Sequence, residues 1–505
     1  MSVLDQGVKL DGTQWSLRSS FENSGPYVFL ISFACLYYVS NAATILGHYD
    51  LGWHLAAGDL IRARGEVPFQ DLWSFTLGDR QWFNASWLWD VTASAIYQYA
   101  GVSGLLLFVV ACGAIIAGYL TAIGLSSRAS AVAVCIAVFA ACLVYPSYAT
   151  DPNCYLSAAP NMATMLFSVM FYGECLKRTR CLLLPPVMLL WVNSHGGFVL
   201  GFLIVAVFGA TALLRRDWSG VKLYGLTGIG CFLAIFVNPL GWHIYDGVIT
   251  TVGHFVQQQI TEWLPYYHNL TWPGSIPAIA CILIFIAFEL RFPRHGRIPP
   301  EARLLSWLFL GLGIYQFRYM SFFFLFSSVV MAHHVDRLLP ERMKSLEVRK
   351  SLIWAGVMGA CALPLMFLRI EPTLGLSPML SEQEAVYLQA HYSNARVLNH
   401  WNVGGLLIFY ARGRVPVFVD GRAATAYPDD LLRDYFKLVQ VDKNDVDAAA
   451  WDAVLEKYRI DAVLWVKAHD ELRHFLVDER GWKEDASARY MTVYVRPSSA
   501  SQAHR

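Results

Sequence analysis

Charged residues are scarce in this sequence of 505 residues: Asp, Glu, Lys and Arg make up 15% of it, against about 25% in an ordinary soluble domain. Hydrophobic residues make up 56%, a balance that argues against a soluble enzyme and excludes a disordered chain or a coiled coil. A strong net charge is also missing. The formal value of +1 excludes a strongly basic nucleic-acid-binding protein, so no nucleic-acid partner is expected.

A disulfide framework and a zinc site are missing as well. The ten cysteines, from Cys35 to Cys361, lie in or beside apolar runs, and no spacing between them resembles a zinc site. We expect them to be small apolar fillers. The chain begins with a polar stretch rather than an apolar segment with a cleavage site, so no removable signal peptide is predicted.

Long apolar runs fill the first three quarters of the chain, and a helix needs about 20 such residues to span a membrane. The runs cover residues 26–46, 103–125, 131–148, 162–176, 182–193, 198–214, 223–237, 276–290, 304–315, 319–331 and 352–368. The predicted fold is a polytopic α-helical membrane domain with about eleven transmembrane helices over residues 1–370.

Lys and Arg in the short loops predict the orientation. Alternate loops carry Arg128, Lys177, Arg178, Arg180, Arg215, Arg216, Lys222, Arg291, Arg294, Arg297, Arg303, Arg337, Arg342, Lys344, Arg349 and Lys350. In the other loops Asp50, Asp59, Glu66, Asp71, Asp79, Asp90, Asp151, Asp246 and Glu262 outweigh Arg62, Arg64, Arg80 and Arg318. We therefore expect a plasma (inner) membrane protein with a cytoplasmic N-terminus and a periplasmic or extracytoplasmic C-terminal region.

Two regions are expected outside the membrane. The first outer loop, residues 47–102, has juxtamembrane helices over 51–64 and 87–99. Residues 371–505 have an ordinary soluble composition and predict a small α/β domain. Its strands are expected at 396–398, 406–410, 415–419, 462–466 and 491–496, and its helices at 429–440 and 446–458.

Charges are nearly absent from the middle of the predicted spans, whereas an ion-coupled transporter places ionisable groups near the midplane. The pattern favours chemistry at the outer surface. Asp50 and His54 are four residues apart and would share one face of a helix. Asp50 is a candidate general base or metal ligand, with His54 orienting or ligating. A helix cap at the end of a span is the alternative for Asp50.

Two further acids return to the same predicted face. Asp151 stands at the outer end of the third run, where Asp-Pro also fits a simple turn, and Glu262 lies in an outer loop that has no Lys or Arg. Glu262 is a candidate acceptor or metal contact, and its alternative is an exposed loop acid. If a divalent cation such as Mg or Mn is used, Asp50, Asp151 and Glu262 are its candidate ligands.

Two basic side chains are candidates for binding a phosphate. His195 lies in a turn with paired glycines, where a hydrogen-bonded structural His is the alternative. Arg318 is the main cation at the outer ends of the later runs, and a snorkelling interfacial Arg is its alternative. In the outer domain, Trp401, Asp420 and Arg422 stand in two segments that predict turns first and substrate contacts second.

The chain resembles the GT-C superfamily of integral-membrane glycosyltransferases, which includes protein O-mannosyltransferases, the aminoarabinose transferase of lipid A and the oligosaccharyltransferase catalytic subunit. It looks most like a bacterial branch of that superfamily. The motifs are D-x-x-W-H-x-x-x-G from Asp50, P-x-x-D-x-W-S-F from Pro68, N-x-x-W-L from Asn84, W-x-N-x-H-G-G-F from Trp191, N-P-x-G from Asn238, E-W-x-P from Glu262 and V-D-G-R from Val419.

The resemblance implies a polyprenyl-phosphate-linked sugar donor and a lipid, glycan or protein acceptor at the outer face, among membrane lipids. Asp50 and Asp151 would be the first-loop and second-loop acids, and Glu262 and Arg318 the fifth-loop acid and the phosphate-contacting Arg. The segment from Trp401 is similar to the W-W-D-Y-G motif of oligosaccharyltransferase, but the Asp and the Tyr are missing. A glycosyltransferase of this kind would invert the configuration at the anomeric carbon. The alternatives are a lipid-linked glycan flippase and a non-catalytic scaffold that binds a glycan-assembly partner.

Overall fold

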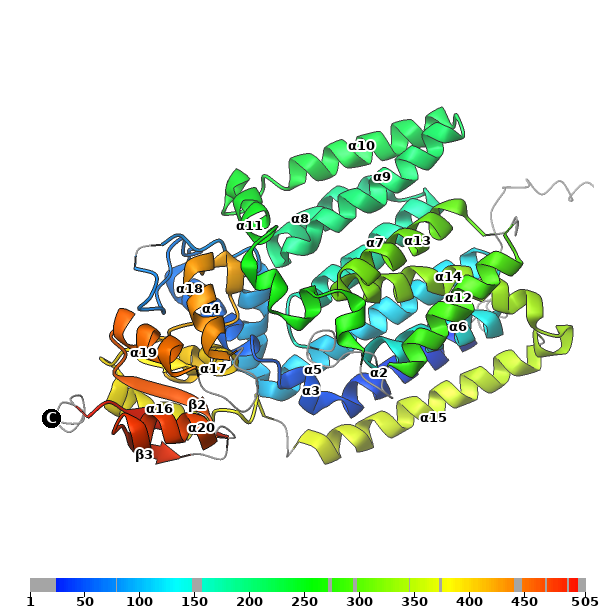
Figure 1. Cartoon of the computed structure of the whole chain (residues 1–505). Coiled ribbons are helices and arrows are strands. Elements are labelled where there is room, and N and C mark those ends of the chain that lie inside the picture. The colour runs from blue at the N-terminus through cyan, green and yellow to red at the C-terminus, as the bar shows by residue number, and fades with distance from the viewer. Residues whose placement is uncertain are drawn as a thin grey trace, which may run out of the picture.

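The computed structural model describes residues 24–78, 80–147, 157–270, 275–293, 298–344, 346–371, 375–439, 447–467, 470–487 and 490–497. Most of them are helical. In Figure 1 the long helices lie side by side, and the C-terminal unit sits at one end of them, which we call the domain-bearing end. This end carries the candidate site.

All eleven predicted apolar runs form helices. A helix with apolar side chains on every side is buried among other helices or in lipid, which is why these helices pack as a bundle. The first run is two helices, α2 and α3, separated at Asn41. The bundle consists of α2 (Gly25–Ser40), α3 (Ala42–Leu46), α5 (Trp87–Ser126), α6 (Ala131–Ser147), α7 (Asn161–Lys177), α8 (Leu184–Ser194), α9 (Val199–Leu214), α10 (Trp218–Ala234), α12 (Ile276–Arg291), α13 (Pro300–Tyr315), α14 (Met320–Leu338) and α15 (Leu346–Ile370).

Three helical segments in the described part of the chain are long and apolar enough to cross a membrane: 87–126, 196–214 and 348–370. The number of eleven membrane crossings stays a prediction. Helix α5 contains a break at Gly101, whose φ of 60° and ψ of −157° are not helical. The predicted juxtamembrane segment 87–99 therefore precedes the break, and the apolar run 103–125 follows it.

The C-terminal unit is built around a four-stranded sheet in the order β1-β2-β4-β3. Strands β1 (Val397–Asn399) and β2 (Ala462–Val466) are parallel, and β4 (Met491–Val495) is antiparallel to both β2 and β3 (Lys483–Ser487). The helices of this unit are α16 (Glu382–Tyr392), α17 (Trp401–Tyr410), α18 (Asp429–Val439), α19 (Ala448–Lys457), α20 (Asp470–Arg473) and the π-helix His474–Glu479.

Two of the predicted strands are wrong. Residues 406–410 belong to α17, because this short apolar run is buried on both sides, and such a run fits a buried helix as well as a strand. Residues 415–419 form no named strand and pair only through isolated bridges at Val417. The predicted strands at 396–398, 462–466 and 491–496 and the helices at 429–440 and 446–458 are confirmed within one or two residues, among those described.

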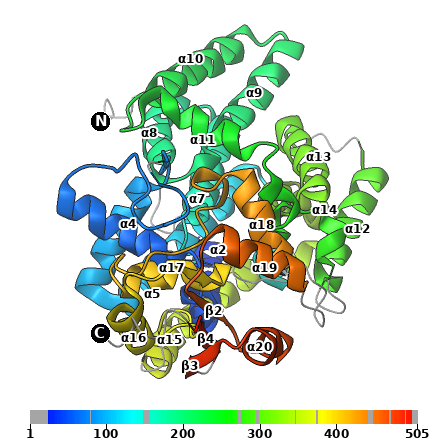
Figure 2. The same ribbon diagram turned by 60° about the vertical axis from the view of Figure 1, so that its left-hand side comes forward.

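The first loop and the C-terminal unit share one hydrophobic core. Trp53, Trp73 and Trp82 of the loop pack into the same cluster as the apolar side chains of α17 and the sheet. Helix α4 (Leu51–Arg64), with the predicted bounds, lies against α17, and Figure 2 shows the two side by side at this end. A Cβ on Gly52 would lie 2.5 Å from the carbonyl oxygen of Gly405, so these helices touch backbone to backbone.

Candidate functional site

Asp50 lies between α3 and α4, at the first position before α4. Its side chain makes no capping hydrogen bond, so the helix-cap alternative does not explain it. Its backbone N–H donates to His48 Nδ1 at 3.1 Å. The carboxylate is half-buried and lies against Gly421 of the C-terminal unit, where a Cβ would overlap its Oδ1. Asp50 is thus placed where the bundle, the first loop and the C-terminal unit meet.

His54 is held by a buried carboxylate. Its Nδ1 lies 2.6 Å from Oδ1 of Asp90, and Asp90 Oδ2 accepts a hydrogen bond of 2.8 Å from Asn84 Nδ2. Asp90 is 0% exposed. This network joins α4 to the start of α5 and fixes the first turns of α4, from which Asp50 projects. Asp90 follows His54 by 36 residues in the sequence, so helical spacing could not predict this contact.

His195 is fixed as a neutral hydrogen-bond donor. Its Nδ1 accepts from the backbone N–H of Gly197 at 3.1 Å, and the Thr164 hydroxyl lies 2.7 Å from the same atom. That hydroxyl accepts from Trp191 Nε1 at 2.9 Å, so its own proton is directed to His195. Because Nδ1 is the acceptor, the ring proton is assigned to Nε2.

The pKa of His195 is lowered to about 3, first by burial and then by the electrostatic effects of Arg318 and of His54. His54 and His195, from two of the predicted motifs, and Arg318 therefore lie near enough to act on one another. His195 stays neutral at physiological pH, and the cation at this end is supplied by Arg318.

Arg318 is positioned by the segment that contains Glu262. Its guanidinium lies 4.1 Å from the ring centre of Trp263, and its Nη1 is 3.9 Å from Glu262 Oε1. The backbone N–H of Phe317 donates to the carbonyl of Leu264 at 2.9 Å, which ties the two turns together. The ion pair is long and partly exposed, so it contributes little to stability, and its main effect is to orient the guanidinium.

Asp151 lies outside the described residues. The chain is described again from Ser157, and the backbone N–H of Ala158 donates to the carbonyl of Ile45 at 3.0 Å. The start of α7 is thereby anchored to α3, five residues before Asp50.

Arg422 and Asp420 are buried inside the C-terminal unit and are not exposed to a ligand. The Arg422 guanidinium is 0% exposed, donates to Asp420 Oδ2 at 2.7 Å and is paired with Asp71 of the first loop. The rings of Trp73 and Trp82 lie 5.0 Å from it. The geometry gives these residues a structural role, and we do not retain them as substrate contacts.

Trp401 also packs inside the C-terminal unit. Its backbone N–H donates to the hydroxyl of Tyr435 at 2.7 Å, and its ring lies against Tyr435 and Phe436. Its position at the start of α17 serves the packing of this helix.

A metal site does not emerge from the described residues: among them no three His, Cys, Asp or Glu side chains are grouped so that they could hold an ion. Asp151, the third candidate ligand beside Asp50 and Glu262, lies outside the described residues, so the predicted cation site stays a prediction.

Neither a protein-family model nor a curated protein matches the chain. Among solved structures, the oligosaccharyltransferase of Archaeoglobus fulgidus in the apo form superposes with a TM-score of 0.53 at 11% identity, over 87% of this chain and 69% of that one. The same enzyme tethered to an acceptor peptide that contains the NVT sequon gives 0.51 at 10% identity, over 92% and 73%. The likeness establishes the fold.

ArnT from Cupriavidus metallidurans in the apo state gives a TM-score of 0.39 at 13% identity, over 94% of this chain and 98% of that one. The fold likeness rests on the oligosaccharyltransferase structures alone. This likeness agrees with the helical fold expected from the GT-C resemblance, and the number of membrane crossings stays a prediction. At 11% identity it carries over no activity and no site residue.

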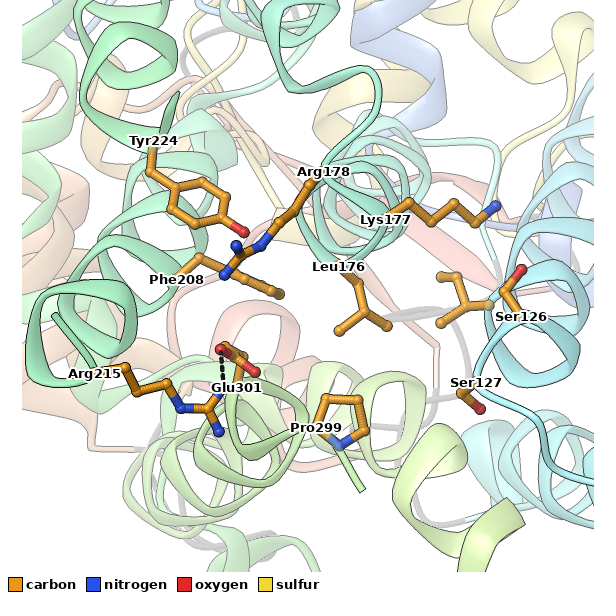
Figure 3. A pocket seen from close by; sticks show the side chains of 11 residues that line it. Ser126, Ser127, Leu176, Lys177, Arg178, Phe208, Arg215, Tyr224, Pro299 and Glu301 are labelled. Carbon is orange, nitrogen blue, oxygen red and sulfur yellow. Dashed lines mark hydrogen bonds and ion pairs between the residues drawn. The ribbon is translucent and has the colours of Figure 1, made fainter. Parts of the chain in front are cut away.

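A cavity of about 310 Å³ lies at the opposite end of the bundle, among the ends of α5, α7 and α9 and the start of α13. Figure 3 shows the Arg178 guanidinium pointing toward Tyr224, and Arg215 bonded to Glu301. Arg178 pairs with Asp217, and Arg215 lies 3.5 Å from Glu301, so both arginines are neutralised. None of the candidate site residues lines this cavity.

Sequence reasoning missed the residues that hold the candidates in place. Asp71 and Asp90 have no predicted role of their own beyond that of outer-loop acids, and Thr164 lies inside an apolar run. A signal existed for Asp71 and Asn84, since both belong to the motifs from Pro68 and Asn84. Thr164 and Asp90 carry no comparable signal.

Proposed function

We propose that this chain is a membrane glycosyltransferase that moves a sugar from a polyprenyl-phosphate donor to a hydroxyl of a lipid, glycan or protein acceptor. The observation that carries the proposal is the convergence at the domain-bearing end. There the first loop meets the turn of His195, since Trp87 Nε1 donates to Asn193 Oδ1 at 2.7 Å, and Asp50 stands one helical turn from His54. The oligosaccharyltransferase fold supports this reading.

In the proposed reaction Asp50 is the general base. Its carboxylate takes the proton of the acceptor hydroxyl, whose oxygen attacks the anomeric carbon of the donor sugar. The bond between that carbon and the phosphate oxygen breaks on the opposite side, so the configuration inverts. The products are the glycosylated acceptor and polyprenyl phosphate.

Arg318 and His195 act on the leaving group. A guanidinium matches the geometry of a phosphate and supplies the compensating charge, while Nε2–H of His195 donates a further hydrogen bond. Glu262 and Trp263 hold the Arg318 side chain in place. His54, fixed by Asp90, holds the turn that carries Asp50.

Asp151 is proposed to position the acceptor, the role that the resemblance suggests for its second-loop acid. The proposed steps are written with side chains of this chain alone. The segment from Trp401 lacks the Asp and the Tyr of the similar motif, which favours a hydroxyl acceptor over the amide of a sequon. We place the reaction at the outer face of the plasma membrane, where the loop charges put this end.

The proposal is tested with the purified protein in lipid nanodiscs and a panel of polyprenyl-phosphate sugars, by mass spectrometry. We expect one donor to give polyprenyl phosphate and glycosylated acceptor in equal amounts. The variant Arg318→Gln should be slower by about 10²–10³-fold, and Arg480→Gln, at an exposed arginine of the C-terminal unit, should match the wild type. Equal rates for Arg318→Gln and the wild type would contradict the role of Arg318.

A further inference from the structure

Gly421 lies directly against the Asp50 carboxylate. The three atoms nearest to the position of a Cβ on Gly421 all belong to Asp50: Oδ1 would be overlapped, Cγ would lie at 2.6 Å and Oδ2 at 3.2 Å. The backbone of Gly421 is not in the left-handed region, so its conformation does not by itself require glycine. The missing side chain is required by the space that the carboxylate occupies.

The turn that carries Gly421 cannot withdraw from Asp50, because both neighbours of Gly421 are fixed in a buried cluster. Asp420 Oδ1 accepts from the backbone N–H of Arg422 at 2.9 Å and from its Nε at 2.8 Å. The hydroxyl of Tyr427 donates to Asp420 Oδ2 at 2.7 Å. If a side chain were added at Gly421, the Asp50 carboxylate would therefore have to move.

The same cluster is anchored to the first loop. Arg422 is paired with Asp71 and donates to Ser74 Oγ at 2.9 Å. The backbone N–H of Val417, near the start of the turn, donates to the carbonyl of Trp73 at 2.9 Å. The turn is thus connected to the segment that follows α4 as well as to the C-terminal core.

We infer that Gly421 is a positioning residue for Asp50 and that the C-terminal unit completes the catalytic site. The inference rests on the proposed function for the role of Asp50. Gly421 borders the carboxylate of Asp50 on one side. The cluster of Asp420, Arg422 and Asp71 fixes the position of Gly421. The decisive feature is the absent Cβ, which leaves the space that the Asp50 carboxylate occupies.

The test is a mutant cycle on the full chain with transfer rate and unfolding temperature as readouts. Gly421→Ala keeps the carboxylate but displaces it, and a displacement of about 1 Å can cost about 10²-fold in rate. We expect at least that loss, and we expect no further loss when Gly421→Ala is added to Asp50→Asn. Gly375→Ala is the matched control, since a Cβ there meets no atom within 4 Å.

The unfolding temperature separates positioning from a general packing defect. Asp50→Ala removes the atoms that the new Cβ would overlap. Gly421→Ala should therefore lower the unfolding temperature of the wild type but not that of Asp50→Ala, even if the single variant folds poorly. An equal decrease in both backgrounds, or full activity of Gly421→Ala while Asp50→Asn is inactive, would overturn the inference. Full activity of Asp50→Asn would instead overturn the proposed function.

Discussion

His195 is a side chain whose chemistry is decided by its neighbours at the scale of single residues. Gly197 and Thr164 occupy Nδ1, and Trp191 directs the Thr164 proton toward it. The ring is left with one donor and no charge. A leaving phosphate would thus receive a hydrogen bond from His195 and its charge compensation from Arg318.

The lowered pKa of His195 predicts a dependence of stability on pH. The unfolded chain takes up a proton near pH 6.5, whereas the folded chain does so only near pH 3. This contribution is fully present above pH 6.5 and is lost as the pH falls toward 3, by at most about 1.4 kcal/mol per pH unit. In His195→Asn the decrease in unfolding temperature from pH 7 to pH 5 should be smaller than in the wild type.

The control for this comparison is His268→Asn, at an exposed histidine, which should keep the pH dependence of the wild type. Parallel curves for His195→Asn and the wild type would show that His195 does not carry the lowered pKa.

At the scale of elements, Arg422 joins the first loop to the C-terminal unit. A buried ion pair gains little net stability, because both partners lose their hydration. Here the cost is offset by hydrogen bonds from Arg422 to Asp420, Asp71, Ser74 and Tyr427 and by the rings of Trp73 and Trp82. The cluster therefore fixes the first loop and the C-terminal unit relative to each other, although they are distant in the sequence.

Removal of the Arg422 guanidinium should be strongly destabilising. Arg422→Met leaves Asp71 and Asp420 buried without their cation, which costs about 3–5 kcal/mol. The matched control is Arg480→Met, since Arg480 pairs with Asp452 at the surface and such pairs contribute about 0–1 kcal/mol. Chemical or thermal unfolding checks the difference, and equal stability of the two variants would refute the role of the cluster.

The elements differ in how far sequence predicts them. Helix α4 has the predicted bounds, because its apolar positions recur at helical spacing. Residues 406–410 are mispredicted, because a continuous apolar run has no period that separates a buried helix from a buried strand. Gly404 and Gly405 of α17 allow this helix to pack closely against the turn near Asp420 and against α4, a contact that the sequence pattern does not show.

The long-range partners of the site lie beyond what one sequence can show. Asp71 and Arg422 are 351 residues apart, and only the folded chain brings them together. The gathering of His54, His195 and Arg318 at one end does follow from the sequence, since alternate loops of a helical bundle return to the same face.

At the scale of the whole molecule, the loop charges predict which end faces the cytoplasm. We expect Gln383→Cys, exposed in α16, to be labelled in intact cells by a membrane-impermeant maleimide. Arg342→Cys, exposed after α14, should be labelled only in permeabilised cells. The chain without an added cysteine gives the background. The reverse pattern would contradict the predicted orientation and move the proposed site to the cytoplasmic face.

The most direct test of the account is the transfer rate of Asp50→Asn in purified, folded protein. Asn has the shape of Asp but cannot take a proton, so the rate should fall by about 10²–10⁴-fold. Asp59→Asn, on the exposed side of α4, the helix that begins directly after Asp50, should stay near the wild-type rate. If Asp50→Asn transfers sugar as fast as the wild type does, Asp50 is not the general base, and the proposed mechanism is wrong.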